Sequence, residues 1–400
     1  MIIGIIGGGA SGMAAAIAAA QYPGVQIRLY ERQTRVGKKL MATGNGRCNL
    51  TNLNMDLSCY HGEDPTFAKT ALSKMDAAAT CSWFRDLGLY TVAEKAGRVY
   101  PYSDQANSVV DVLRLALNRE NITLLAGVEV TKLRCKDSGF LINDTDHCDC
   151  VIVACGGLAG TKLGGTMAGY KLLGKMGHKT TKLRPSLVQL KCAWPAVVSL
   201  KGVRCECKVE ILNNGKTFAQ SSGELQFTDY GLSGPVIFEI SRDVCFGTGD
   251  WCARLDFMTG LTKEELYDEL ISRKERNLPM EELFTGILHN RLGRVLTKAV
   301  GIAGNMAEQL TKDDLCSLVE AVKSFEIVLT EPMGMDHAQV TAGGVLTAEF
   351  DAETMESKLV PGLYACGEVL DIDGDCGGYN LQWAWASGVL AGQSAGRKIK

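Results

Sequence analysis

Residues 1–31, MIIGIIGGGASGMAAAIAAAQYPGVQIRLYE, decide how the rest of this chain folds. The apolar run Met1–Ile6 predicts a strand, the Ala/Ile-rich segment from Ala14 predicts a helix, and Gln26–Tyr30 predicts a second strand. Three glycines between the first strand and the helix form the pattern G-x-G-x-x-G: Gly7, Gly9 and Gly12. In such a unit the glycines permit a tight turn, the approach of a pyrophosphate and close helix–strand packing, and the helix N-terminus attracts phosphate. The stretch therefore predicts a Rossmann-like dinucleotide-binding fold of the α/β class.

Glu31, at the end of the second strand, narrows the choice of dinucleotide. It follows the glycine motif at roughly the 20-residue distance where an acidic side chain binds the ribose hydroxyls. A carboxylate there would repel a 2′-phosphate, so the motif argues against NADP at this site. Residues 1–27 carry no charge and could instead form a membrane span or a signal peptide. Three consecutive glycines weaken a spanning helix, and the run has neither a basic leading segment nor a convincing cleavage site, so we expect no membrane segment.

Composition sets broad limits on function. At 400 residues with 46% apolar residues, the chain is long enough for two or three domains with substantial cores. A net charge of −3 and a pI near 6.0 give no electrostatic basis for nucleic-acid binding. The 15 cysteines contain no C-x-x-C spacing and the five histidines do not cluster, so we expect no metal site. Buried thiols in a reduced cytosol explain the cysteines best, which predicts a cytoplasmic protein of unassigned oligomeric state.

Further strand-to-glycine junctions lie far from the first one. Cys150–Cys155 is a continuous apolar run, as expected for a buried parallel strand, and it ends at Gly156-Gly157. Leu363–Cys366 ends in the same way at Gly367-Glu368, and Gly377–Asn380 precedes a helix predicted over Leu381–Ala395. A nicotinamide dinucleotide would normally need only the first junction. Junctions spread over the whole chain indicate a longer cofactor, FAD, bound by a discontinuous domain.

An insertion separates the two parts of this domain. Short alternating segments over Trp194–Phe218 are broken by a hairpin signal at Asn213-Asn214-Gly215, and a capping box of Thr262 and Glu265 opens a helical stretch. We predict an FAD-binding domain over residues 1–189 and 331–400, a β-rich subdomain over 190–260 and a helical subdomain over 261–330. Within the FAD-binding domain, further predicted elements are helices over Pro65–Gly88 and Ala106–Glu120, and strands over Ile122–Leu125 and Val128–Leu133.

Several longer motifs resemble a known family. They are GKKLMATGNGRCNLTN (37–52), GRVYPYSDQANSVVDVL (97–113), PSLVQL (185–190), FTDYGLSGP (227–235) and TMESKLVPGLYACGEVLDIDGDCGGYNLQWAWASG (354–388). Together with the first motif they are similar to the YhiN/BaiN-type FAD-dependent oxidoreductases, which include the aminoacetone oxidases. The resemblance runs from residue 1 to about residue 396. It implies a two-dinucleotide-fold FAD domain with a β-rich and a helical subdomain inserted.

The resemblance also implies which residues hold FAD. The first motif with Glu31 and Arg32 would bind ADP, and Val130 would lie near the adenine. Lys39 and residues 44–49 would lie along the pyrophosphate and flavin, and residues 367–368 and 377–381 would hold the ribityl chain and ring. With the junction Cys155–Gly157, the predicted cofactor residues are Gly7, Gly9, Ser11, Gly12, Glu31, Arg32, Lys39, Gly44, Gly46, Arg47, Cys48, Asn49, Val130, Cys155, Gly156, Gly157, Gly367, Glu368, Gly377, Gly378, Tyr379, Asn380 and Leu381. One departure is Ala168, which stands where many relatives carry an acid.

The reaction is open among three hypotheses. The first is reduction of an activated C=C bond in a hydrophobic, steroid- or bile-acid-like substrate, with NAD(P)H as the transient electron donor. The second is an O2-using amine oxidase that releases peroxide, and the third is a non-catalytic flavin-binding or RNA-associated protein that kept the fold. Hydride transfer through flavin N5 needs chiefly a dry pocket and a proton source. Candidate substrate anchors are Arg47 and Asn49, and candidate proton donors are Tyr100, Tyr102, Tyr230 and Tyr379.

Overall fold

The computed structural model describes residues 1–136, 139–302 and 306–398. The chain forms two compact units, one made of Met1–Arg184 with Gln339–Lys400 and the other of Pro185–Ala338. The boundaries predicted from the sequence, after residues 189 and 330, differ from these by a few residues on either side of the insertion. Among the described residues, no helix combines the length and the apolar character needed to cross a membrane.

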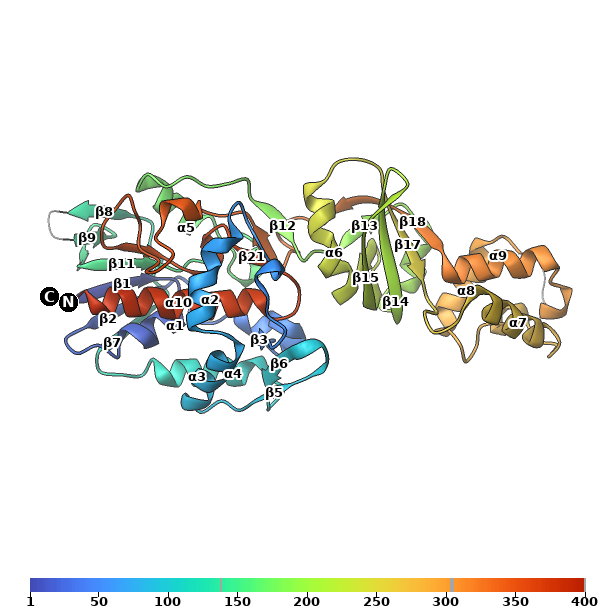
Figure 1. Ribbon diagram of the computed structural model, residues 1–400, viewed down its shortest axis with the longest axis horizontal. Coiled ribbons are helices and arrows are strands. Elements are labelled where there is room, and N and C mark those ends of the chain that lie inside the picture. Colours follow the sequence, from blue (N-terminus) through green and yellow to red (C-terminus); the bar gives the residue numbers. More distant parts are fainter. Residues whose placement is uncertain (137–138, 303–305, 399–400) are drawn as a thin grey trace. The chain divides into compact units, whose positions relative to one another are not determined.

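The first unit is built on a five-stranded parallel sheet (Figure 1). Its order is β20-β11-β1-β2-β7, with β1 at the centre because the chain crosses over on both sides of it. Both β1 and β11 are buried apart from the first residue of β1, which explains why they are continuous apolar runs. The strands are β1 (Ile2–Ile6), β2 (Gln26–Glu31), β7 (Ile122–Ala126), β11 (Cys150–Val153) and β20 (Leu363–Ala365).

Two helices from opposite ends of the sequence pack against each other in this unit. Figure 1 shows α1 (Ala10–Ala19) alongside the long helix α10 (Tyr379–Arg397). A Cβ atom at Gly388 would lie 2.4 Å from the carbonyl oxygen of Ser11, so only glycine permits this approach. The predicted helix Leu381–Ala395 is confirmed, extended by two residues at each end.

Two predictions for the first unit are wrong in detail. The single helix predicted over Pro65–Gly88 is interrupted, because Met75 leaves the helical conformation and the Asp76 side chain caps a new helix by accepting from Ala79 N. The strand predicted over Val128–Leu133 begins only at Leu133, because the Asn143 side chain binds the backbone N–H of Thr131 in place of a neighbouring strand.

The remaining elements of this unit are shorter. They are α2 (Lys69–Lys74), α3 (Ala77–Asp86), α4 (Ala106–Ala116), α5 (Ala168–Lys175), β3 (Thr51–Asn52), β4 (Tyr60–His61), β5 (Thr91–Ala93), β6 (Arg98–Pro101), β8 (Leu133–Lys136), β9 (Gly139–Ile142), β10 (Asp146–Cys148), β19 (Val340–Ala342) and β21 (Asp373–Gly374). Strands β3, β6 and β5 form a small antiparallel sheet, and β21 pairs with β4. Strand β12 (Arg184–Ser186) contains the change to the second unit.

The second unit combines a closed antiparallel barrel with the helices α6 to α9, and it has its own apolar core. The barrel order is β13-β16-β15-β14-β17-β18. The predicted hairpin is confirmed, because Asn214 and Gly215 both adopt positive φ between the paired residues Asn213 and Lys216. The elements are β13 (Leu190–Cys192), β14 (Arg204–Asn213), β15 (Lys216–Phe227), β16 (Gly231–Ser233), α6 (Pro235–Phe246), β17 (Trp251–Asp256), α7 (Lys263–Lys274), α8 (Asn290–Ala299), α9 (Lys312–Lys323) and β18 (Phe325–Pro332).

The helical part of this unit begins as predicted and ends earlier. The capping box of Thr262 and Glu265 is present at the start of α7. The predicted helical subdomain over 261–330 includes most of β18, which pairs with β17 and β13 and therefore belongs to the barrel. Helical character ends at α9, and the chain then returns to the barrel as its last strand.

Candidate functional site

The turn between β1 and α1 has the geometry of a phosphate site. Gly7 has φ of +114°, and a Cβ atom at Gly12 would lie 1.8 Å from the Gly7 carbonyl oxygen, so neither position accepts a side chain. At Gly9, by contrast, a Cβ atom would have no neighbour within 4 Å. The first intrahelical bond of α1 runs from Met13 N to Gly9 O, which leaves the preceding amides directed outward from the helix end. This end can therefore receive an anion.

Glu31 is fixed beside this turn. Its Oε2 accepts from the backbone N–H of Gly8 at 2.8 Å, and its Oε1 accepts from that of Gln33 at 2.7 Å. Arg32 extends to the segment before α5, where it donates to the carbonyl of Gly164 at 2.9 Å. Val130 is buried on the chain that leaves the same end of the sheet. A carboxylate at the end of β2, next to the glycine turn, can accept from the hydroxyls of a ribose.

Four segments that are distant in sequence meet at the second and third junctions. Glu368 forms an ion pair with Lys39, with 2.8 Å between Oε2 and Nζ, and its Oε1 accepts from Thr341 N at 2.8 Å. A Cβ atom at Gly157 would lie 2.6 Å from Glu368 Oε1. The sequence singled out Lys39, Gly157 and Glu368 separately, and the fold brings them together. Thr341 was missed, although its strand, β19, runs into Gly343-Gly344 in the same strand-to-glycine pattern that marked the other junctions.

The loop over residues 40–49 departs from regular backbone geometry. Gly44, Asn45, Gly46 and Cys48 all have positive φ, which is uncommon for residues with side chains such as Asn45 and Cys48. Backbone of this kind is concentrated where a ligand or substrate is held. The Cys48 side chain is fully buried, and burial raises the pKa of its thiol to about 12. Cys48 is therefore a protonated, unreactive thiol in this structure.

An unsatisfied polar atom lies between this loop and the start of α10. Asn49 Oδ1 is buried and has no hydrogen-bond partner among the described residues. It lies 2.9 Å from the Cβ atom that a side chain at Gly378 would have, and Gly378, with φ of +106°, is also pressed against the Thr51 carbonyl. The first intrahelical bond of α10 runs from Gln382 N to Gly378 O, so the amides before it are directed outward. A buried acceptor beside outward amides suits the polar edge of an isoalloxazine ring, whose N–H and C=O groups alternate.

The side chain of Asn380 is occupied within the protein. Its Oδ1 accepts from Gly374 N at 2.8 Å, and its Nδ2 donates to Gly374 O at 2.6 Å. Asn380 thus holds the loop before α10 in place, and the part it can offer a cofactor is its backbone.

The candidate catalytic residues occupy different environments. The guanidinium of Arg47 lies 4.1 Å from the ring centre of Tyr100 and forms ion pairs with Glu94 and Asp104. Tyr379 is mostly buried, in edge-to-face contact with Tyr60 at 6.1 Å between ring centres, and burial raises its pKa. Tyr102 is 77% exposed. Tyr230 belongs to the second unit, where its ring contacts His337 at 6.4 Å between centres.

Two residues of α5, Ala168 and Tyr170, lie in a segment whose role was left open by the sequence. The Tyr170 hydroxyl on α5 is buried without a hydrogen-bond partner among the described residues, and burial, with Glu368 as the next contribution, raises its pKa. Ala168, at the position of the family acid, is the first residue of α5, and its N–H binds the hydroxyl of Thr166. Within the described part of the chain, no group of three or more His, Cys, Asp and Glu residues is arranged to hold a metal ion.

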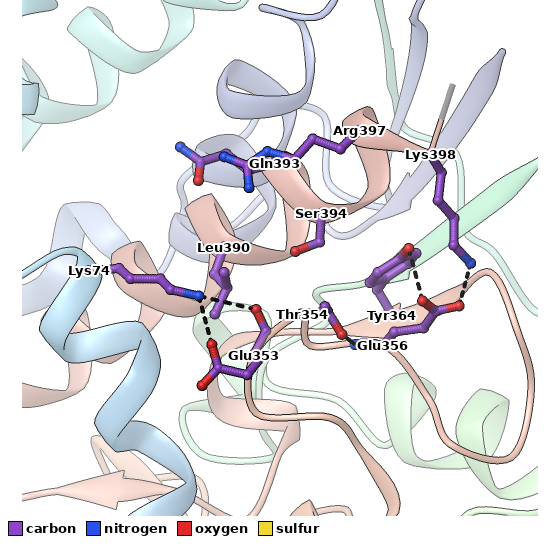
Figure 2. Close-up of a pocket in the computed structure, with 10 residues that line it drawn as sticks. All are labelled: Lys74, Glu353, Thr354, Glu356, Tyr364, Leu390, Gln393, Ser394, Arg397 and Lys398. Atoms are coloured by element: carbon purple, nitrogen blue, oxygen red, sulfur yellow. Dashed lines mark hydrogen bonds and ion pairs between the residues drawn. The ribbon is translucent and has the colours of Figure 1, made fainter. Parts of the chain in front are cut away.

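A hollow of about 480 Å³ lies near the other end of α10 (Figure 2). Four of its charged groups form two ion pairs, Lys74 with Glu353 and Lys398 with Glu356, and Arg397 donates to the Tyr22 hydroxyl. The residues that line it are Lys74, Glu353, Thr354, Glu356, Tyr364, Leu390, Gln393, Ser394, Arg397 and Lys398. None of the glycine junctions contributes to this hollow, so it is separate from the cofactor site.

Comparisons with known proteins agree with the geometry. The family model described as the HI0933-like protein Rossmann domain matches residues 1–394. The 3-dehydro-bile acid delta(4,6)-reductase of Clostridium scindens is 41% identical and is matched over 99% of both chains. The ribosomal RNA dihydrouridine synthase of Escherichia coli is 29% identical over 97% of this chain and 96% of its own. The crystal structure of the 3-ketosteroid delta1-dehydrogenase from Sterolibacterium denitrificans has a TM-score of 0.52 at 12% identity, with 99% of each chain covered, which shows a shared fold.

The parallel sheet, the three glycine junctions and these matches define an FAD-dependent oxidoreductase with a Rossmann-like cofactor domain. The chain belongs to the family of HI0933-like proteins. The resemblance to the YhiN/BaiN-type flavoproteins is thereby confirmed.

Proposed function

We propose that this protein reduces a C=C bond conjugated to a carbonyl group in a hydrophobic, steroid-like substrate. The observation that carries the proposal is the 41% identity, over 99% of both chains, to a 3-dehydro-bile acid delta(4,6)-reductase. A match over 99% of this chain spans both the candidate cofactor site and the inserted unit. A bound FAD would supply hydride from its reduced ring to the substrate.

Different segments of the first unit would bind different parts of FAD. The β1–α1 turn and Glu31 would hold the ADP half, and Lys39 with Glu368 would lie along the middle. The loop of residues 44–49 and the start of α10 would hold the ring, with Asn49 Oδ1 accepting from a ring N–H. The same amides at the start of α10 favour negative charge on the ring.

We propose NAD(P)H as the electron donor. The chain contains no second G-x-G-x-x-G motif, so a nicotinamide would bind transiently, without a dedicated Rossmann domain of its own. Anaerobic stopped-flow absorbance of the FAD-bound protein tests both the proposed electron donor and the proposed substrate class. NADH or NADPH should bleach the flavin, and a 3-oxo-4-ene steroid should restore its absorbance. Failure of both nucleotides to bleach the flavin would contradict the donor, and a bleached flavin that no enone reoxidises would contradict the substrate class.

A second candidate substrate is a uracil ring in RNA. It is favoured by the 29% identity, over nearly the whole chain, to a ribosomal RNA dihydrouridine synthase. The chemistry is closely related, because the C5=C6 bond of uracil is also conjugated to a carbonyl. The net charge of −3 opposes strong binding to a polyanion, and the absence of nucleic acid among the partners stays a prediction. Formation of dihydrouridine in a ribosomal RNA transcript, with no reduction of steroid enones, would favour this candidate over the first.

A further inference from the structure

Tyr100 occupies a distinctive position next to the loop assigned to the flavin. It lies on β6, its side chain is nearly buried, and the residue is 7% exposed. A Cβ atom at Gly44 would lie 3.5 Å from the edge of the Tyr100 ring, so the ring packs directly against the loop. The guanidinium of Arg47, from the same loop, covers one face of the ring at 4.1 Å.

The neighbouring arginine of β6 links Tyr100 to the second flavin segment. Arg98 is two residues before Tyr100, and side chains at this spacing on a strand point to the same side. A Cβ atom at Gly377 would lie 3.6 Å from Arg98 Nε. Strand β6 thus contacts the segments near residues 44 and 377, and both segments are expected to enclose the flavin ring.

This setting keeps Tyr100 a protonated phenol beside two cationic side chains. Burial, with smaller contributions from Glu94 and Cys376, raises the pKa of Tyr100, while the charges of Arg98 and Arg47 act in the opposite direction without reversing the shift. Glu94 opposes the arginines, but it is engaged with Arg47, with 2.5 Å between its Oε1 and Nη2. A phenolate formed at Tyr100 would therefore be stabilised by two neighbouring guanidinium groups.

We propose that Tyr100 is the catalytic acid that protonates the substrate carbon next to the carbonyl group. This inference rests on the proposed function. The substrate receives a hydride at its β-carbon from the reduced cofactor, and the electron pair of the C=C bond moves toward the carbonyl oxygen to give an enolate. The O–H bond of Tyr100 then breaks as a C–H bond forms at the α-carbon. Solvent water returns a proton to the phenolate.

The first test compares Tyr100→Phe with Tyr90→Phe. Tyr90 is a matched control because it is 66% exposed and also has an arginine, Arg85, over its ring at 5.7 Å. Flavin reduction by NAD(P)H should be unchanged in both variants. Reoxidation by a 3-oxo-4-ene steroid should slow about 10²- to 10⁴-fold in Tyr100→Phe, the usual range for loss of a general acid, and stay at the wild-type rate in the control.

The second test reads the ionisation of Tyr100 without turnover. The ultraviolet tyrosinate band of the FAD-bound protein is titrated, and the difference between wild type and Tyr100→Phe isolates Tyr100. Arg47→Ala should shift this titration to higher pH, and Arg85→Ala should leave it in place. Wild-type enone reduction that survives in Tyr100→Phe, or a titration insensitive to Arg47, overturns the role of Tyr100 alone. A wild-type protein that reduces no enone overturns the proposed function itself.

Discussion

Replacing Asn49 with leucine is expected to affect the apoprotein and the FAD complex in opposite directions. Asn49 Oδ1 is buried, and no residue that the structure describes forms a hydrogen bond with it. A buried acceptor without a hydrogen bond costs about 1–3 kcal/mol, and a leucine of similar shape removes that cost. The apoprotein of Asn49→Leu should therefore be more stable than the wild type by about 1 kcal/mol.

The complex should be weakened by the same substitution. Loss of the hydrogen bond from the flavin, together with a flavin N–H left without an acceptor, amounts to about 1.5–3 kcal/mol, or roughly a 10- to 100-fold increase in the Kd for FAD. Urea unfolding of the apoprotein and flavin fluorescence titration measure the two effects. Asn54→Leu, at an exposed position nearby, is the control and should change neither. An Asn49→Leu apoprotein clearly less stable than the wild type, or one that binds FAD with undiminished affinity, would refute the reasoning.

Four further substitutions test other parts of the proposed site and of the fold. Glu31→Gln removes the charge that accepts from Gly8 N, and calorimetry should show FAD binding weakened by about 10-fold or more; unchanged affinity would remove Glu31 from the site. Burial lowers the pKa of the buried His178 imidazole, so its contribution to stability is complete above the unfolded pKa of about 6.5 and is lost as the pH falls through the lower folded pKa. His178→Gln should therefore flatten the pH dependence of the urea midpoint. An unaltered pH dependence would count against this role of His178. Gly388→Ala places a Cβ atom 2.4 Å from a carbonyl oxygen of α1 and should destabilise the protein by about 1–3 kcal/mol. Gly174→Ala, a helical position with open space around it, should stabilise the protein by roughly 0.5 kcal/mol. Equal thermal midpoints for the two variants would contradict the close packing of α1 and α10.

Features that depend on neighbouring residues were predictable from the sequence. The β1–turn–α1 unit follows from the glycine spacing and the apolar run. The hairpin at Asn214-Gly215 and the capping box at Thr262 follow from the backbone preferences of those residues. Each of these patterns determines a local structure that tertiary packing does not need to override.

Features that depend on long-range contacts were harder to predict. The break at Met75 arises because Asp76 prefers to cap a new helix, although the apolar spacing continues across it. The ion pair of Lys39 with Glu368 joins residues more than 300 positions apart, and the contact of Gly44 with Tyr100 depends on the small sheet that contains β6. Such juxtapositions follow from topology, and a sequence pattern can indicate the partners separately without placing them together.

The most direct measurement of the central claim is mass analysis of the product after one anaerobic turnover. The FAD-bound protein, reduced by NAD(P)H, is given a 3-oxo-4-ene steroid and a uridine-containing ribosomal RNA transcript in the same reaction. We expect a steroid product heavier by two hydrogen atoms, in an amount equal to the flavin reoxidised, with the RNA unchanged. Recovery of unaltered steroid from a reduced enzyme, with or without dihydrouridine in the RNA, would contradict it.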